Sequence, residues 1–199
     1  ITNREDEFLL TLMKLRCNKD DIELGFFFNI DESSVSKVFR TWINFMFFQF
    51  QELNLWISRS VVDQHMPADF KKKFPNTRVI IDGTEIPIVK PGNVHDQSAT
   101  FSTYKNKNTL KILVGIAPSG LVTYISEAYA GSASDRQIVE RSSLLKEDLL
   151  SPNDSIMADR RFVVQDLFCL KNVHINMPTV MRGINQLPPD KVIRDRRIA

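Results

Sequence analysis

The 199-residue sequence predicts an α+β protein, with a helical module at the N-terminus and a mixed sheet after it. Three observations support this prediction. Apolar residues recur at helical spacing as far as Phe50, and short β-branched runs between turn signals follow Thr77. Two of those runs, Arg78–Ile81 and Ser155–Ala158, are each followed by an aspartate. We therefore divide the chain into a helical module (1–50), a helical linker (51–76) and a sheet domain (77–199).

Composition and charge exclude several classes of protein. A hydrophobic content of 43% is enough for a real core, and the formal net charge is only +2. Cys17 and Cys169 lie far apart without metal-type spacing, so we expect free thiols in a reducing compartment. No apolar run reaches membrane-spanning length, so no membrane partner is expected. The chain begins without methionine and ends in a helical pattern, so we expect a C-terminally truncated fragment.

The N-terminal module reads as three helices. Thr2 and Glu5 have the spacing of a capping box, which predicts a first helix over Asn3–Arg16. Asn18 can cap a short second helix, and Asp31 can cap a third.

The third predicted helix has two contrasting faces. Its apolar residues repeat at helical spacing from Val35 to Ile43. The opposite face is small, hydroxylated and basic: Ser33, Ser36, Lys37 and Arg40. A short helix, a turn and a helix with such a face are typical of a helix-turn-helix that binds duplex DNA. The alternative is a three-helix bundle with an ordinary solvated face.

Three further segments have less specific patterns. Phe45–Phe50 suits a linking helix packed between the two parts, or else a partner interface. In the linker, Ser58 and Pro67 are expected helix starts. The polar stretch Asn93–Asn108 predicts an exposed loop or edge ribbon. Its lysines, Lys105 and Lys107, could hold a phosphate backbone or serve solubility alone.

The order of elements after Thr77 predicts the topology of the sheet. A strand ending at Asp82 is followed by the hairpin strands Leu110–Ala117 and Leu121–Ala130. Ser134 then caps a crossover helix, and a strand ending at Asp159 follows. This order matches a ribonuclease H-like sheet, in which the first and last of these strands are parallel neighbours.

The predicted topology brings Asp82 and Asp159 together, while Asp135 stays peripheral at the start of the crossover helix. Neighbouring carboxylates repel one another unless they share a proton or a cation, and such hard oxygen ligands suit Mg²⁺ or Mn²⁺. Paired ions of this kind promote phosphodiester cleavage.

The sequence also resembles the DDE superfamily endonucleases, meaning the Harbinger-type transposases and the cellular proteins derived from them. The matching segments run in the same order along nearly the whole chain: Asp6–Arg16, Ser34–Trp42, Ile81–Ile86, Ser98–Thr100, Tyr104–Lys105, Gly115–Gly120 and Ser155–Arg160. The resemblance implies a metal-dependent nuclease with Asp82 and Asp159 as catalytic and metal-binding acids. It further implies double-stranded DNA as partner, a homodimer or an accessory DNA-binding protein, and the nucleus as location.

Two departures from the family pattern lead to a second hypothesis. Arg161 stands where the family has glycine, and the family's third acid, a glutamate, is expected beyond Ala199. Glu85 and Asp135 are the nearby carboxylates that could replace that acid, although neither has the expected position, and Glu85 is the first candidate. We expect residues 1–199 to bind metal weakly and to cut DNA poorly.

The alternative function is a catalytically inactive, domesticated DNA-binding or scaffold protein. A small-molecule hydrolase has little support, because no nucleophile motif is present.

Overall fold

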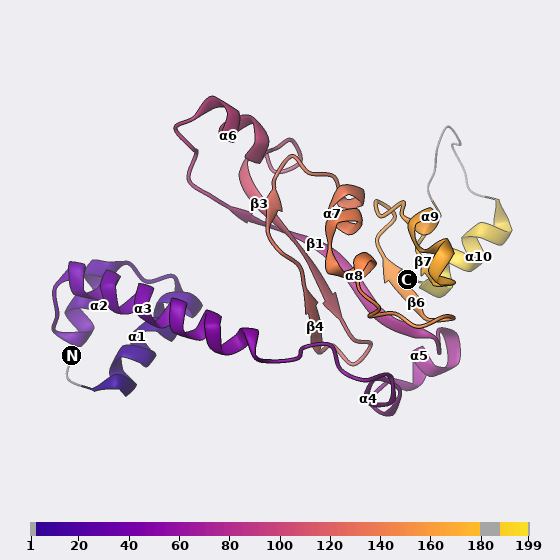
Figure 1. The fold of residues 1–199 in the computed structure, drawn as a ribbon, viewed down its shortest axis with the longest axis horizontal. Helices are drawn as coiled ribbons and strands as arrows, with labels where there is room; N and C mark the ends of the chain where they lie inside the picture. The colour runs from indigo at the N-terminus through magenta and orange to yellow at the C-terminus, as the bar shows by residue number, and fades with distance from the viewer. Residues whose placement is uncertain (1–2, 180–187, 199) are drawn as a thin grey trace. The chain divides into compact units, whose positions relative to one another are not determined.

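The computed structural model describes residues 3–179 and 188–198, and it divides the chain into two compact units (Figure 1). The first unit is Ile1–Asn54 and the second is Leu55–Ala199. Within the predicted linker (51–76), residues 51–54 are grouped with the first unit and residues 55–76 with the second.

The first unit consists of α1 (Arg4–Cys17), α2 (Asp21–Phe28) and α3 (Glu32–Gln51). One residue from each helix, Leu10, Leu24 and Val35, is completely buried in its core. Phe45–Phe50 continues α3 and does not form a separate helix.

Capping residues explain where these helices begin and end. Asp31 caps α3 as predicted, since its Oδ1 accepts a hydrogen bond from the Ser34 amide at 2.9 Å. The predicted cap at Asn18 is wrong, because Asp20 caps α2 and Asn18 ends α1 in the left-handed conformation with a φ of 52°. The first helix is capped by Asn3, and Thr2 lies outside the described residues.

Two short helices open the second unit. Ser58 caps α4 (Arg59–Gln64), and Pro67 precedes α5 (Ala68–Lys73), as predicted. Arg59 donates hydrogen bonds to the carbonyls of Pro75 and Asn76 and to the buried carboxylate of Asp154. This one side chain therefore holds α4 against the segments that lead into two strands of the sheet.

A sheet of seven strands forms the centre of the second unit, in the order β2-β3-β1-β6-β7, with β4 and β5 also paired to β3. The strands are β1 (Thr77–Pro87), β2 (Phe101–Ser102), β3 (Lys107–Ile116), β4 (Val122–Ile125), β5 (Tyr129–Ala130), β6 (Ser155–Ala158) and β7 (His174–Asn176). β3 is antiparallel to β1, whereas β6 is parallel to both β1 and β7. The predicted neighbours, β1 and β6, are therefore confirmed. The ribonuclease H-like classification stays a prediction.

The sheet differs from expectation in three places. β1 continues past Asp82 to Pro87, because its second half keeps pairing with β3. The predicted strand Leu121–Ala130 is divided between β4 and β5. Part of the predicted loop is a helix, α6 (Val94–Thr100), which begins where Asn93 accepts a hydrogen bond from the His95 amide. In Figure 1, α6 lies at the end of β3 remote from β4.

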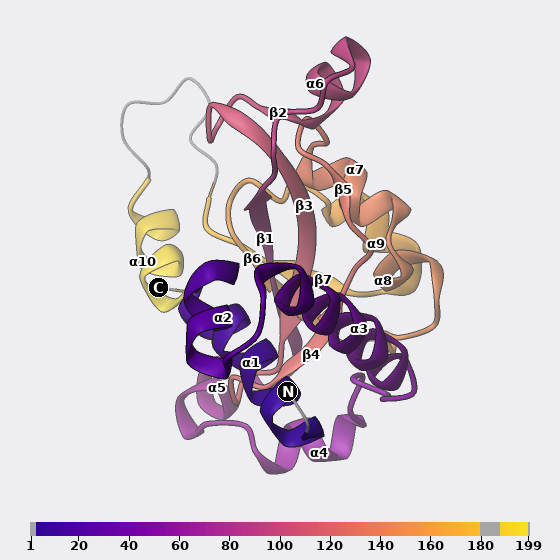
Figure 2. The same ribbon diagram turned by 90° about the vertical axis from the view of Figure 1, so that its left-hand side faces the viewer.

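The remaining helices are α7 (Asp135–Arg141), α8 (Ser143–Lys146), α9 (Gln165–Phe168), the 3₁₀ turn η1 (Cys169–Lys171) and α10 (Pro189–Ile198). Figures 1 and 2 both show α7 and α8 on the same side of the sheet. Ser134 caps α7 in a complete capping box with Gln137.

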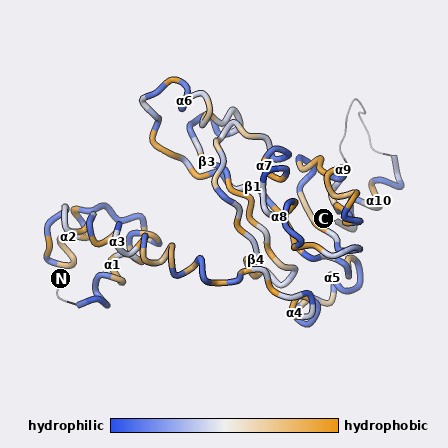
Figure 3. The backbone as a smooth tube through the Cα atoms, viewed as in Figure 1, coloured by the Kyte–Doolittle hydropathy of each residue, from blue (hydrophilic) through white to orange (hydrophobic). Residues whose placement is uncertain are grey.

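The main core lies between the strands and the helices α7, α8 and α9. It includes Val79 and Ile81 of β1, Ile138 of α7, Ile156 of β6 and Phe168 of α9. Figure 3 shows the hydrophobic residues along β1 and β3. In the described ranges, no helix combines the length and apolarity needed to cross a membrane.

Candidate active site

The parallel pairing of β1 and β6 sets the position of the two predicted acids. Ile81 pairs with Ala158, and the next residues along the two strands are Asp82 and Asp159. Both are exposed, and together with Arg161 they help to line a pocket of about 470 Å³. The sequence-based prediction that these strands are adjacent is confirmed, whereas the catalytic role of the two acids stays a prediction.

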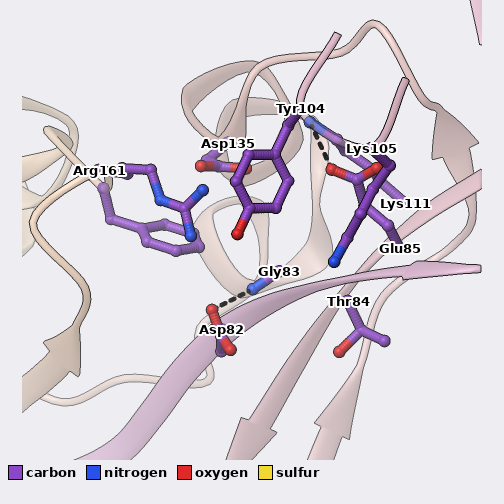
Figure 4. A pocket seen from close by; sticks show the side chains of 10 residues that line it. Asp82, Gly83, Thr84, Glu85, Tyr104, Lys105, Lys111, Asp135 and Arg161 are labelled. Atoms are coloured by element: carbon purple, nitrogen blue, oxygen red, sulfur yellow. Dashed lines mark hydrogen bonds and ion pairs between the residues drawn. The ribbon is translucent and has the colours of Figure 1, made fainter. Parts of the chain in front are cut away.

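Asp82 also borders a second pocket, of about 360 Å³, shown in Figure 4. Three acids and three cations line it together with polar and aromatic residues: Asp82, Glu85, Asp135, Lys105, Lys111, Arg161, Gly83, Thr84, Tyr104 and Phe162. Asp82 and Arg161 belong to both pockets, so the two hollows meet at these side chains.

Asp135 is part of this site, and the prediction that it stays peripheral is wrong. The first turn of α7 lies so close to β1 that a Cβ added to Gly83 would be 3.4 Å from Asp135 Oδ1. Burial raises the pKa of Asp135, and the negative charges of Asp82 and Glu85 raise it further. The positive charges of Lys111 and Arg161 oppose this increase in the pKa. A half-buried carboxyl group therefore faces the Asp82–Gly83 backbone.

Glu85 is occupied by its own partners. Its Oε1 lies 3.6 Å from Lys111 Nζ, and its Oε2 accepts a hydrogen bond from Thr109 Oγ1 at 3.0 Å. Burial alone would raise the pKa of Glu85, but hydrogen bonds from Ser102 and Thr109 and the charge of Lys111 hold that pKa below its ordinary value. Glu85 thus serves as a half-buried counter-ion to Lys111 in the structure.

Asp159 is also paired. Its Oδ2 lies 3.1 Å from Arg161 Nε, and its Oδ1 accepts a hydrogen bond from the Arg160 amide at 2.7 Å. The hydrogen bond to Asp159 raises the pKa of the Arg161 guanidinium. Arg161 also lies over Tyr104, with its guanidinium carbon 5.0 Å from the ring centroid.

The residues present do not fit a pair of divalent ions in this arrangement. Both oxygens of Asp159 have partners, and Glu85 is bound to Lys111. Cations equal acids in number around the pocket of Figure 4, so an incoming ion would meet little net negative charge. Within residues 3–179 and 188–198, no group of three His, Cys, Asp or Glu residues could hold a metal ion.

The predicted DNA-binding face lies in the first unit. Ser33, Lys37 and Arg40 are exposed on α3, and Ser36 is half-buried, whereas Val35 of the same helix is in the core. Gly25 allows the turn before α3 to lie close to α2, because an added Cβ would be 2.7 Å from the Ile30 carbonyl oxygen. The four polar residues therefore share one face of a helix that follows a tight turn, while their contact with DNA stays a prediction.

The first unit is a helical module with a tight turn before α3, and the second is a mixed sheet with one acid within β1 and one directly after β6. The profile of the DDE superfamily endonucleases matches residues 81–199, and that of the helix-turn-helix of DDE superfamily endonucleases matches residues 3–52. The chain therefore belongs to the DDE superfamily endonucleases, which generally use divalent metal ions. A search among curated proteins finds none that matches the chain.

Sequence reasoning missed some of the residues around the site. Lys111 looked like part of an apolar strand, and Asp135 looked like a helix-dipole residue. The available signal for Asp135 was Gly83, because a glycine after a strand aspartate allows another element to approach the backbone closely.

Proposed function

We propose that this chain is a transposase-derived DNA endonuclease of the Harbinger type, in which the α3 face binds duplex DNA and Asp82 and Asp159 are catalytic acids. The main support is the register of β1 and β6, which places the two aspartates directly after paired residues of neighbouring parallel strands. Carboxylate oxygens are the ligand type preferred by the hard cations of phosphodiester cleavage, but Asp159 would have to exchange its ion pair with Arg161 for such an ion. Dependence on Mg²⁺ or Mn²⁺ and action on DNA in the nucleus are parts of this proposal.

The DNA-binding part of the proposal depends on the first unit. Ser33 and Ser36 offer hydroxyl groups to phosphates or bases, and Lys37 and Arg40 offer positive charge. The family match over residues 3–52 supports the same assignment. A second copy of the chain, or an accessory DNA-binding protein, would supply a further contact with the substrate.

The test is a nicking assay on supercoiled plasmid at increasing Mn²⁺ concentration. We expect slow conversion to the open-circular form that depends on the metal and is lost in Asp82→Asn. Asp96→Asn is the matched control, because Asp96 is an exposed acid on α6 that lines neither pocket of the site. Nicking that persists in Asp82→Asn would contradict the assignment of that residue.

A second function, DNA binding without cleavage, is favoured by one specific observation. The Arg161–Asp159 ion pair already gives one of the two acids a cationic partner within the chain. If wild-type protein binds plasmid and nicks it no faster than Asp82→Asn at any Mn²⁺ concentration, the second function replaces the first.

A further inference from the structure

We propose that Arg161 is a tethered cation that excludes a divalent metal ion from Asp159. The inference rests on the proposed function insofar as Asp159 is taken as a metal-binding acid. Its Oδ2 is the oxygen that Arg161 binds, at 3.1 Å, while its Oδ1 is already bound to a backbone amide. An incoming ion must therefore displace Arg161 before it can bind Oδ2.

The backbone restricts how far Arg161 can move away. The Phe162 amide donates a hydrogen bond to the Asp159 carbonyl at 2.9 Å, and the Val163 amide donates one to the Arg161 carbonyl at 3.0 Å. Phe162 is 2% exposed and belongs to the main core. The backbone of Arg161 is thus held in a tight turn between Asp159, with which its side chain pairs, and the buried Phe162.

Contacts of the side chain hold the guanidinium at the site. Tyr104 lies between Arg161 and Lys105 in Figure 4, and both cations are 5.0 Å from its ring centroid. The cation–π contact lets Arg161 keep a partner on its planar face while its Nε binds Asp159. Tyr104 thereby favours the conformation in which the guanidinium stays beside the acids.

Arg161 also affects the acids that it does not bind. It lines both pockets in company with Asp82, and one of them includes Asp135. A fixed positive charge there opposes the approach of a second cation to any of these carboxylates. Removal of a neighbouring charge changes a carboxylate's affinity for a cation by on the order of tenfold or more. We therefore expect Arg161 to set the metal affinity of the whole site.

The experiment measures Mn²⁺ binding to the full chain by the loss of the free-ion electron paramagnetic resonance signal. Wild type, Arg161→Gly, Arg161→Lys and Arg161→Gly/Asp159→Asn are compared. We expect Arg161→Gly to bind Mn²⁺ at least tenfold more tightly than wild type, and Arg161→Lys to change little because the charge remains. The double variant should lose most of the gain, because the freed Asp159 oxygen is then an amide.

Arg160→Gly is the matched control for the loss of one arginine and for a glycine in the same turn, since Arg160 lines neither pocket of the site. Circular dichroism melting shows whether each variant is folded. If folded Arg161→Gly binds Mn²⁺ no more tightly than wild type, or if Arg160→Gly shows the same gain, the inference is overturned. Tighter Mn²⁺ binding without nicking would leave the role of Arg161 intact and count against the endonuclease function.

Discussion

Arg59 Nη1 lies 2.7 Å from Asp154 Oδ1 and joins the start of α4 to the residue that precedes β6. Asp154 is almost completely buried, and its other oxygen accepts a hydrogen bond from the Ser151 amide at 2.9 Å. Arg59 supplies the only cation within 4 Å of this carboxylate among the ion pairs of the described residues. The pair therefore matters more for stability than an exposed ion pair would.

Arg59→Ala should destabilise the second unit by about 3 kcal/mol, because it leaves a buried carboxylate without its counter-ion. Arg59→Lys should recover only part of that loss. The single ammonium group of lysine cannot bind Asp154 and also make the hydrogen bonds that the planar guanidinium donates to the Pro75 and Asn76 carbonyls. Urea denaturation measures both. Lys72→Ala, which removes an exposed charge from α5, should change the free energy of unfolding by less than about 0.5 kcal/mol. A similar small loss for Arg59→Ala would contradict the structural role of the pair.

The double variant Lys37→Ala/Arg40→Ala should bind duplex DNA more weakly and with a smaller salt dependence. If each side chain neutralises one phosphate, the slope of log affinity against log salt should fall in magnitude by about 1.8. Fluorescence anisotropy over a range of NaCl concentrations measures the slope. Arg4→Ala/Arg16→Ala removes the same charge from exposed positions on α1 and should leave the slope nearly unchanged. Equal effects of the two double variants would argue against a specific DNA-binding face on α3.

The cap of α3 should make the first unit sensitive to acid. Hydrogen bonds from the Ser33 and Ser34 hydroxyls and from the Ser34 amide hold the pKa of Asp31 well below its ordinary value of 3.8. A carboxyl group whose pKa is lower in the folded protein stabilises the fold above its unfolded pKa, and this contribution disappears as the pH falls through the folded pKa.

Wild type should therefore be more stable than Asp31→Ala at pH 7, and the difference should begin to shrink only below about pH 4. Thermal melts followed by helical circular dichroism measure it. The chemical shift of the Ser34 amide should titrate with the same low pKa. A midpoint at or above 3.8 would show that the capping hydrogen bonds do not stabilise the carboxylate in solution.

Gly25→Ala should destabilise the first unit although alanine favours a helix. The added Cβ would be 2.7 Å from the Ile30 carbonyl oxygen, and Ile30 is itself bound to Gly25 through a backbone hydrogen bond of 3.0 Å. The backbone must shift, at a cost of about 1–3 kcal/mol, which exceeds a helical gain of about 1 kcal/mol. Chemical denaturation measures the net loss. Gly92→Ala is the control, because no described atom lies within 4 Å of its added Cβ.

Local signals in the sequence predicted local structure well. Asp31, Ser58 and Ser134 each cap the helix expected of them, because capping depends on one side chain and the amides that follow it. The strand predicted over Ser155–Asp159 is observed as Ser155–Ala158, one residue shorter at its end. Its pairing with β1 followed from the order of elements, because crossover connections allow few arrangements.

Features that depend on distant packing were missed. Asp82-Gly83 looked like the end of a strand, yet pairing with β3 carries β1 on to Pro87. The position of Asp135 depends on how closely α7 approaches Gly83, which no periodicity encodes. Arg161 was recognised as a departure from the family pattern, but its contact with Tyr104 required the fold.

The uneven pairing of β1 has a mechanical consequence. Thr77 and Val79–Ile81 pair with β6, whereas Ile80–Pro87 pair with β3. Only Ile80 and Ile81 belong to both ladders. Any movement of the parallel part of the sheet relative to the antiparallel part must therefore be transmitted through these two residues. Their amides should be among the slowest in the chain to exchange with deuterium. Because Asp82 directly follows Ile81, a shift in the pairing of Ile80 and Ile81 would move Asp82 relative to Asp159.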